Sequence, residues 1–313
     1  MAKQSGLGHQ LLVGGNVVGG DVQSYTFSSP TAMIEATDIT QSAHARIPGL
    51  RDGTGSATVF FDPATGAAHD VFKGLPTADV LFHLLCGQVL GAQSACLNAK
   101  QVNYDPTRSN TGEFTFKVDA QANGFGLEWG ELVTPGVRTD TAATNGTSID
   151  DAGGASAPAV PASTVAATNP ARIGATVVVT GGTVTNVVIN GTSAGTGDGT
   201  YTVPGGGTIA ITYSAAPTWT WTWGTAFGGQ AYLSVAAFTG SSATITLQQS
   251  ADNSTWSTLA AFTAVTTGPG SQRVVVANTS SVARYLRVIT TGTFSNLKFA
   301  VTFNRNVSPG VTF

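Results

Sequence analysis

Strict alternation of polar and apolar residues over residues 113–119 most constrains how this chain can fold. The apolar positions are Phe114, Phe116 and Val118, and the polar positions are Glu113, Thr115, Lys117 and Asp119. Because successive side chains of a strand point to opposite faces, the alternation predicts a strand with one buried face and one solvated face. Only 10% of the residues are charged and 39 are glycine, which is typical of turn-rich β proteins. The sequence therefore predicts an all-β fold.

Residues 1–138 are predicted to form a β domain with one short helix. A hairpin is expected over residues 9–28, where apolar runs flank paired glycines. The helix is expected over residues 64–73, because Pro63 suits a first helical turn and the apolar residues share one face. The apolar run at residues 80–86 fits either a buried strand or a helix, and we favour the strand.

A long polar connection, residues 38–53, separates two predicted strands of this domain. Compact domains usually join strands with shorter connections, so a connection of about fifteen residues is either functional or disordered. A turn at Pro48-Gly49 and mixed charge favour a functional loop that contacts a partner, and a flexible surface loop is the alternative. The candidate contact residues are Asp38, Thr40, His44, Arg46, Pro48, Arg51 and Asp52.

Three further segments follow the first domain. Residues 139–172, rich in Thr, Ala, Ser and Gly, are predicted to be a low-complexity linker. Residues 173–226 are predicted to form a small β module, and residues 227–313 a larger β-sandwich. The predicted strands of the last module include residues 232–238, 243–248, 284–290 and 294–303.

Three tryptophans, Trp219, Trp221 and Trp223, alternate with threonines and are expected to lie on one face of a strand. Such a face has two interpretations. It is either an aromatic platform that binds sugars, or a buried face of the module. We favour burial, because large aromatic side chains usually contribute to a core.

The sequence contains no pattern that indicates an enzyme or a cofactor site. The histidines are His9, His44, His69 and His83, which fall on different predicted elements, so no set of titratable groups converges. No nucleophile elbow, metalloprotease motif or phosphate loop occurs. We therefore predict a protein that is not an enzyme and holds no cofactor.

Metal, membrane and nucleic-acid binding are equally unsupported. Cys86 and Cys96 do not have metal-ligand spacing, and they are expected to be two thiols, with a bond between them as the alternative. No apolar run is long enough to cross a bilayer. With a net charge of −3 and no clustered Lys or Arg, the chain is not predicted to bind DNA specifically. The N-terminal residues lack the pattern of a signal peptide, which predicts synthesis and retention in a cytoplasm.

Five sequence pieces in fixed order resemble one protein family. They are LLVGG at residues 11–15, DITQSAHARIPGLRDG at 38–53, TVFFD at 58–62, KQVNYD at 100–105 and GEFTFKVDAQANGFGLEWGELVTPG at 112–136. Their order and spacing over residues 5–150 resemble the tail tube (major tail) proteins of long-tailed bacteriophages. The resemblance implies a β-sandwich with one helix, six copies of which form a ring, and rings that stack into a tube.

The resemblance also implies roles for particular residues and partners. Residues 38–53 would be the loop that reaches the neighbouring ring. Glu113, Thr115, Lys117 and Asp119 would be a candidate lumen face, whose net negative charge would let DNA pass without binding; an ordinary solvated sheet face is the alternative. The expected partners are further copies of the chain, a tape measure protein, and tail terminator and initiator proteins, in a virion tail made in the host bacterial cytoplasm.

The last module resembles the carbohydrate-binding-like sandwich modules that are appended to phage virion proteins. The resemblance is in residues 243–265 and 283–303. It implies that the C-terminal modules decorate the outside of the tail, where they could contact host surface glycans. An alternative function is therefore a carbohydrate-binding or adhesion protein that uses these modules.

Overall fold

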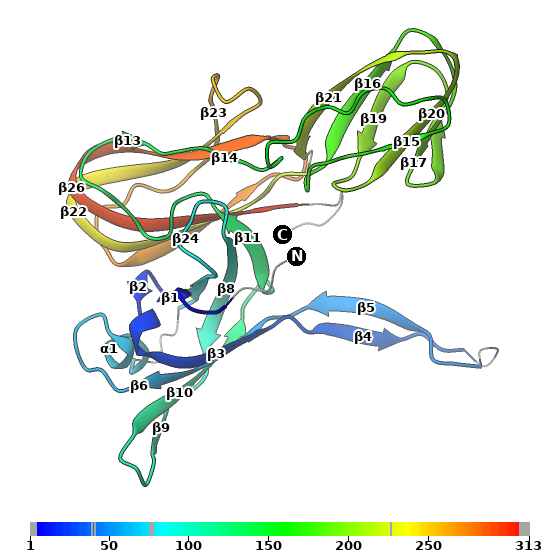
Figure 1. Cartoon of the computed structure of the whole chain (residues 1–313). Helices are drawn as coiled ribbons and strands as arrows, with labels where there is room; N and C mark the ends of the chain where they lie inside the picture. Colours follow the sequence, from blue (N-terminus) through cyan, green and yellow to red (C-terminus); the bar gives the residue numbers. More distant parts are fainter. Residues whose placement is uncertain (1–4, 39, 41, 75–77, 226, 307–313) are drawn as a thin grey trace.

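Antiparallel strands make up nearly all of the regular structure in the computed structural model, which describes residues 5–38, 40, 42–74, 78–225 and 227–306 (Figure 1). In this part of the chain there is one α-helix, α1 (Ala68–Phe72), and one short 3-10 helix, η1 (Gly19–Asp21). The predicted all-β fold is therefore confirmed.

The N-terminal unit consists of two layers of strands with a shared core. One layer has the order β2-β1-β7-β8-β11, and in the other β6 pairs with β3 and β10, and β10 with β9. Phe82 of the first layer and Val118 of the second belong to one buried cluster, which α1 joins through Phe72. The strands are β1 (Gln10–Val13), β2 (Asn16–Val17), β3 (Val22–Ser28), β6 (Thr54–Phe60), β7 (Val80–Leu85), β8 (Gln93–Gln101), β9 (Asp105–Arg108), β10 (Phe114–Ala122) and β11 (Glu128–Leu132).

Two local predictions for this unit have different outcomes. The run at residues 80–86 is a strand, as we favoured, and β7 is buried along almost its whole length. The helix predicted over residues 64–73 is shorter and begins at Ala68. Its expected first turn is instead fixed by carboxylates, since Asp62 accepts a hydrogen bond from the backbone N–H of Ala64 and Asp70 accepts one from Gly66.

The C-terminal unit is built on two very long strands, β22 (Gly229–Ser250) and β26 (Tyr285–Arg305), which pair over their whole length. The sequence predicted four shorter strands here, because glycines interrupt the apolar pattern. The strands instead continue through these glycines, with register shifts on both sides of Gly240 and regular pairing at Gly292. A Cβ at Gly292, whose φ is 115°, would lie 2.4 Å from the backbone oxygen of Ser242, so no side chain fits there. The remaining strands are β23 (Ser257–Ala261) and β24 (Gly270–Val276).

Residues 139–172, which the sequence predicted to be a low-complexity linker, include three short strands that pair with the C-terminal unit. β12 (Arg138–Asp140), β13 (Thr144–Asn145) and β14 (Ile149–Asp150) pair in turn with β26. Two ion pairs stabilise the segment. Arg138 pairs with Asp140 on the same strand, and Arg284 pairs with Asp150 of the segment, each at 2.7 Å. The low-complexity composition did not reveal this, because the strand that orders the segment lies more than a hundred residues further along the chain.

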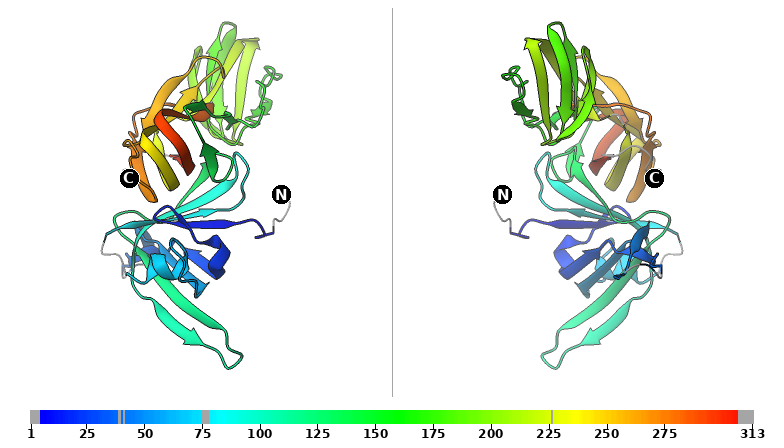
Figure 2. Two further views of the ribbon diagram at one scale, coloured as in Figure 1. Left: turned by 90° about the vertical axis from the view of Figure 1, so that its left-hand side faces the viewer. Right: turned by 90° about the vertical axis from the view of Figure 1, so that its right-hand side faces the viewer.

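The small β module is a sandwich of two four-stranded sheets inserted into the C-terminal unit. The sheets have the orders β15-β20-β17-β18 and β19-β16-β21-β25, with a core between them. The strands are β15 (Ala166–Thr168), β16 (Ala175–Thr180), β17 (Thr183–Ile189), β18 (Thr192–Gly195), β19 (Gly199–Val203), β20 (Thr208–Ala215), β21 (Thr218–Thr225) and β25 (Val282–Ala283). This inserted module and the N-terminal unit lie at opposite ends of the molecule (Figure 2).

One continuous sheet joins the N-terminal and C-terminal units. β11 pairs with β8 on one side and with β26 on the other, so the sheet passes from one unit into the next. Leu12, Leu85 and Leu132 of the N-terminal unit form a buried cluster with Ala300 of β26. The C-terminal unit is therefore part of the same folded body as the N-terminal unit.

Truncation after residue 150 is predicted to give an insoluble protein, because it removes β26 and exposes the edge of β11 and the leucines beside it. Excision of residues 153–226 should be tolerated. Asp151 contacts Arg305, and the backbone oxygen of Gly228 accepts a hydrogen bond from the N–H of Asn306, so the ends to be joined lie beside the last residue of β26 and the residue that follows it.

Solubility and circular dichroism of the two variants test this prediction, with a short Gly-Ser linker joining Ala152 to Phe227 in the excision. A soluble, folded truncation would contradict the joint core.

Candidate functional site

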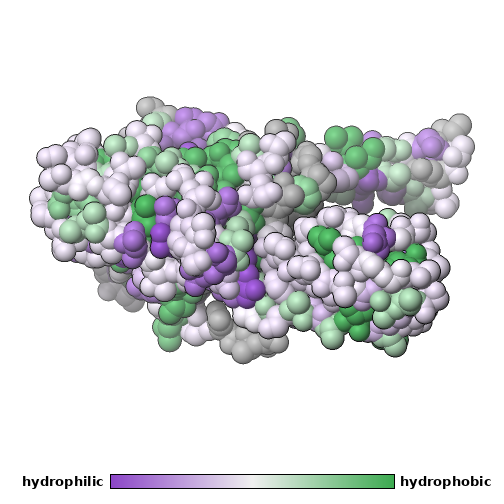
Figure 3. Space-filling model, turned by 90° about the horizontal axis from the view of Figure 1, so that it is seen from above, coloured by the Kyte–Doolittle hydropathy of each residue, from purple (hydrophilic) through white to green (hydrophobic). Residues whose placement is uncertain are grey.

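A two-stranded arm extends from the N-terminal unit and is exposed on both faces (Figure 1). It consists of β4 (Thr31–Glu35) and β5 (Arg46–Arg51), and all five residues of β4 are exposed. Its large apolar side chains remain uncovered, with exposed fractions of 58% for Met33, 57% for Ile34, 55% for Ile47 and 87% for Leu50. Figure 3 shows hydrophobic residues along this arm, at the upper right. Two-stranded hairpins are marginally stable alone, and exposed apolar surface of this extent indicates an interaction site.

The arm replaces the irregular loop predicted over residues 38–53. The tip keeps the expected polar character, since the Asp38 carboxylate accepts hydrogen bonds from the N–H and hydroxyl of Thr40. The Thr40 hydroxyl, followed by its backbone N–H, lowers the pKa of Asp38. The imidazole Nδ1 of His44 lies 2.7 Å from Oε1 of Glu35.

The other candidate loop residues lie along the arm and at its base. Arg46 lies opposite Glu35, and Pro48 lies opposite Met33. Arg51 lies opposite Thr31 at the base, where the backbone N–H of Asp52 donates to the oxygen of Pro30. Sequence reasoning missed the four apolar residues, although the signal was present: short apolar runs flank the polar tip on both sides.

The predicted polar face of β10 is only partly exposed. Glu113 is exposed and accepts a hydrogen bond from Gln23, and Lys117 forms an ion pair with Asp119 at 2.9 Å. Thr115 is buried, contrary to the prediction, and lies between Phe60 of β6 and Thr107 of β9. On the expected apolar face, Phe114 is exposed at the end of the strand.

The three tryptophans do not form a sugar-binding platform. Trp221 and Trp223 are buried in the core of the inserted module, and Trp219 is partly buried against it. The indole N–H of Trp219 donates to the backbone oxygen of Pro158 at 2.8 Å. The favoured interpretation, burial, is therefore confirmed, because the second sheet of the sandwich covers the face.

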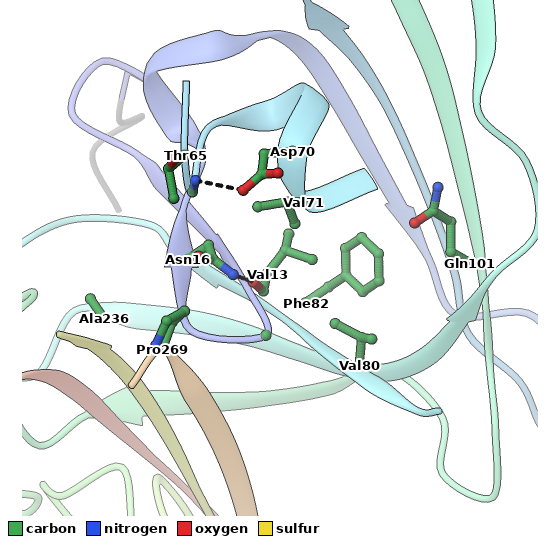
Figure 4. A pocket seen from close by; sticks show the side chains of 12 residues that line it. Val13, Asn16, Thr65, Asp70, Val71, Val80, Phe82, Gln101, Ala236 and Pro269 are labelled. Carbon is green, nitrogen blue, oxygen red and sulfur yellow. Dashed lines mark hydrogen bonds between the residues drawn. The ribbon is translucent and has the colours of Figure 1, made fainter. Parts of the chain in front are cut away.

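A cavity of about 560 Å³ lies between α1, the β1–β2 hairpin and the C-terminal unit (Figure 4). Its walls include Val71, Val80 and Phe82. The one carboxylate, Asp70, is already bonded to the backbone N–H of Gly66 and to Lys73. The hydrogen bond from Lys73 is the main cause of the lowered pKa of Asp70. No second titratable side chain lines the cavity, so it lacks the convergent groups of an active site.

A fully buried histidine lies where the N-terminal unit meets the C-terminal unit. The imidazole of His83 on β7 is within hydrogen-bond distance of Ser234 Oγ (2.9 Å), Ser94 Oγ (3.0 Å) and Thr302 Oγ1 (2.7 Å). Burial lowers the pKa of His83 to about 3. The ring is therefore neutral, and it bonds to three hydroxyls contributed by three other strands, β8, β22 and β26.

Among the described residues, no three His, Cys, Asp or Glu side chains are grouped so that they could hold a metal ion. Cys86 is half-buried and Cys96 is buried, and both are free thiols whose pKa is raised by burial. The part of the chain that the structure describes contains no helix long and apolar enough to cross a membrane.

No family model matches this chain, and no curated protein matches it. Among solved structures, it is similar to the tail of an empty GTA particle with C6 symmetry, at 16% identity and a TM-score of 0.31, over 40% of this chain and 97% of that chain. It is also similar to the SPP1 Dit (gp 19.1) protein, at 9% identity and a TM-score of 0.28, over 95% of this chain and 98% of that chain.

A third similar structure is the phage p2 baseplate in its activated conformation, at 10% identity and a TM-score of 0.30, over 95% of this chain and 98% of that chain. At these identities and TM-scores, the likenesses establish neither a family nor a function.

The buried His83 predicts a pH dependence of stability. Its folded pKa of about 3 lies below the unfolded value of 6.5, so its contribution is present above pH 6.5 and is lost as the pH falls toward 3. Between pH 6.5 and pH 5 the wild type should lose about 2 kcal/mol through this residue.

Urea denaturation of the wild type and of His83→Gln at both pH values measures the effect. Carboxylates with shifted pKa values, including Glu131, are common to both proteins and cancel in the difference. An equal pH dependence in the two proteins would contradict the assignment.

Proposed function

We propose that this chain is a structural subunit of a bacteriophage tail, and that copies of it form six-membered rings, which the arm joins into a stacked tube. The observation that supports this most is the arm, whose four large apolar side chains are uncovered in the single chain. The sequence resemblance over residues 5–150 points to the same role. We assign the chain no enzymatic activity.

The arm is suited to a head-to-tail contact between copies. It extends away from its own body (Figure 1), so in an assembly its apolar residues would reach a surface of a neighbouring copy. Such a contact joins two different patches, and repetition gives a closed ring or an open helix. In the tube, Asp38, Thr40, His44 and Arg46 would contact the neighbouring ring at the tip of the arm. Pro48, Arg51 and Asp52 lie nearer the base.

The exposed part of the β10 face is the proposed lumen surface. Glu113, Lys117 and Asp119 remain candidates, and the buried Thr115 is removed from the set. Two carboxylates against one ammonium give the face a net negative charge, which disfavours contact with DNA phosphates. DNA would then pass during ejection without binding.

The position of the inserted module supports display on the outside of the tail. It lies at the end of the molecule opposite the N-terminal unit that would form the tube (Figure 2). The partners would be other copies of the chain, a tape measure protein, and the tail terminator and initiator proteins, in the virion. Membrane insertion is not part of the proposal.

Replacing both Ile47 and Leu50 by Glu is predicted to block assembly. Because these side chains are exposed in the single chain, the free energy of unfolding should change by less than about 0.5 kcal/mol per site. Burying the added carboxylates between copies would cost far more. Sedimentation and negative-stain electron microscopy of concentrated protein measure rings and tubes directly.

Val165→Glu is the matched control, since Val165 is 51% exposed on the inserted module. It should assemble like the wild type. Tubes formed by the Ile47 and Leu50 variant at the wild-type concentration would contradict the proposed role of the arm.

A further inference from the structure

A small cavity of about 190 Å³ lies where the three units meet. The N-terminal unit contributes Gln93 and residues 129–131, the start of the inserted module contributes Arg172 and Ile173, and the C-terminal unit contributes residues 303–305. Asp151, at the end of the segment that pairs with β26, completes the wall. Cavities at the junctions of folded units are common places for ligands.

Buried charges line this cavity in balanced number. Arg305 donates from Nε to Oδ2 of Asp151, and both side chains are more than nine-tenths buried. Arg172 donates to Oε2 of Glu131 and to the backbone oxygen of Asp151. Burial, followed by repulsion from Asp151, raises the pKa of Glu131 to about 7. Two guanidinium groups thus face two carboxyl groups. Because these positive and negative groups are equal in number, the cavity favours a neutral ligand.

One acceptor in the cavity is left without a hydrogen bond. Oδ1 of Asp151 is buried and makes none, and Nη2 of Arg172 lies 3.5 Å away from it. That oxygen is shielded from solvent, so the polar groups that a ligand would meet are the side chains of Glu131 and Arg172, which are 23% and 46% exposed. Gln93 also lines the cavity, and its carboxamide donates to Oε1 of Glu131 at 3.2 Å.

An exposed indole borders the same cavity. Trp129 and Glu131 are two residues apart on β11, so their side chains point to the same side of the sheet. The Trp129 side chain is 51% exposed, unlike the core tryptophans. An aromatic face beside carboxylate, amide and guanidinium groups suits a sugar ring, which presents C–H bonds on its faces and hydroxyls around its edge.

We propose that this cavity, which we call the junction pocket, binds one pyranose unit of a glycan. A sugar ring would stack on the Trp129 indole, with its hydroxyls beside the accessible carboxyl group of Glu131 and guanidinium of Arg172. This site is distinct from the tryptophans of the inserted module, and its binding does not depend on tube assembly.

The test is ligand-observed saturation-transfer NMR on the full chain with a panel of methyl glycosides of hexoses, 6-deoxyhexoses and N-acetylhexosamines. At least one glycoside should bind the wild type. Trp129→Ala should weaken that binding by about tenfold or more, equivalent to about 1.4 kcal/mol. Trp129→Phe should retain part of it. Trp256→Ala, at a partly exposed tryptophan outside the pocket, should bind like the wild type.

The absence of binding by every glycoside would overturn the proposal, as would binding that Trp129→Ala leaves unchanged. Binding of ethylammonium chloride without any glycoside would also overturn it and indicate a site for cations. Electron microscopy of the Trp129→Ala variant distinguishes a loss of glycan binding from a loss of the proposed tail function. The variant should still form rings and tubes.

Discussion

The pairing of β11 with β26 is the contact on which the rest of the structure depends. Two residue pairs, Glu131 with Phe303 and Leu132 with Thr302, extend the N-terminal sheet into the C-terminal unit. His83 lies beside this pairing and bonds to Ser94 of the N-terminal unit and to Ser234 and Thr302 of the C-terminal unit. A neutral, buried imidazole is favourable here because its ring nitrogens have partners. The two units consequently share a core and act as one rigid support.

This support explains how the inserted module can be placed firmly although a low-complexity segment precedes it. Three short strands, β12, β13 and β14, pair in turn along β26 and lead to Asp151. There the guanidinium of Arg305 donates a hydrogen bond to the Asp151 carboxylate. Arg172 then connects the start of the inserted module to Glu131 of the N-terminal unit. Buried ion pairs are costly to break once formed. The same charges that hold the three units together also form the wall of the junction pocket.

The arm, unlike the joint core, is not stabilised by packing against the rest of the chain. Its strands pair only with each other, and its apolar side chains lie in water. A single chain gains little free energy from such an element, since a hairpin without a covering layer is marginal. The element becomes favourable only when another surface covers it. Within the proposed tail, stability of the subunit and stability of the assembly therefore reside in different parts of the chain.

The sequence by itself determined the all-β class and the polar tip of the arm, because side-chain alternation and turn residues act locally. It did not determine which surface covers each strand. The burial of Thr115 and Trp221, the ordering of residues 139–172 and the junction pocket all depend on strands distant in sequence. Alternation assigns a side chain to one of two faces, but only tertiary contacts decide whether that face meets water or another layer.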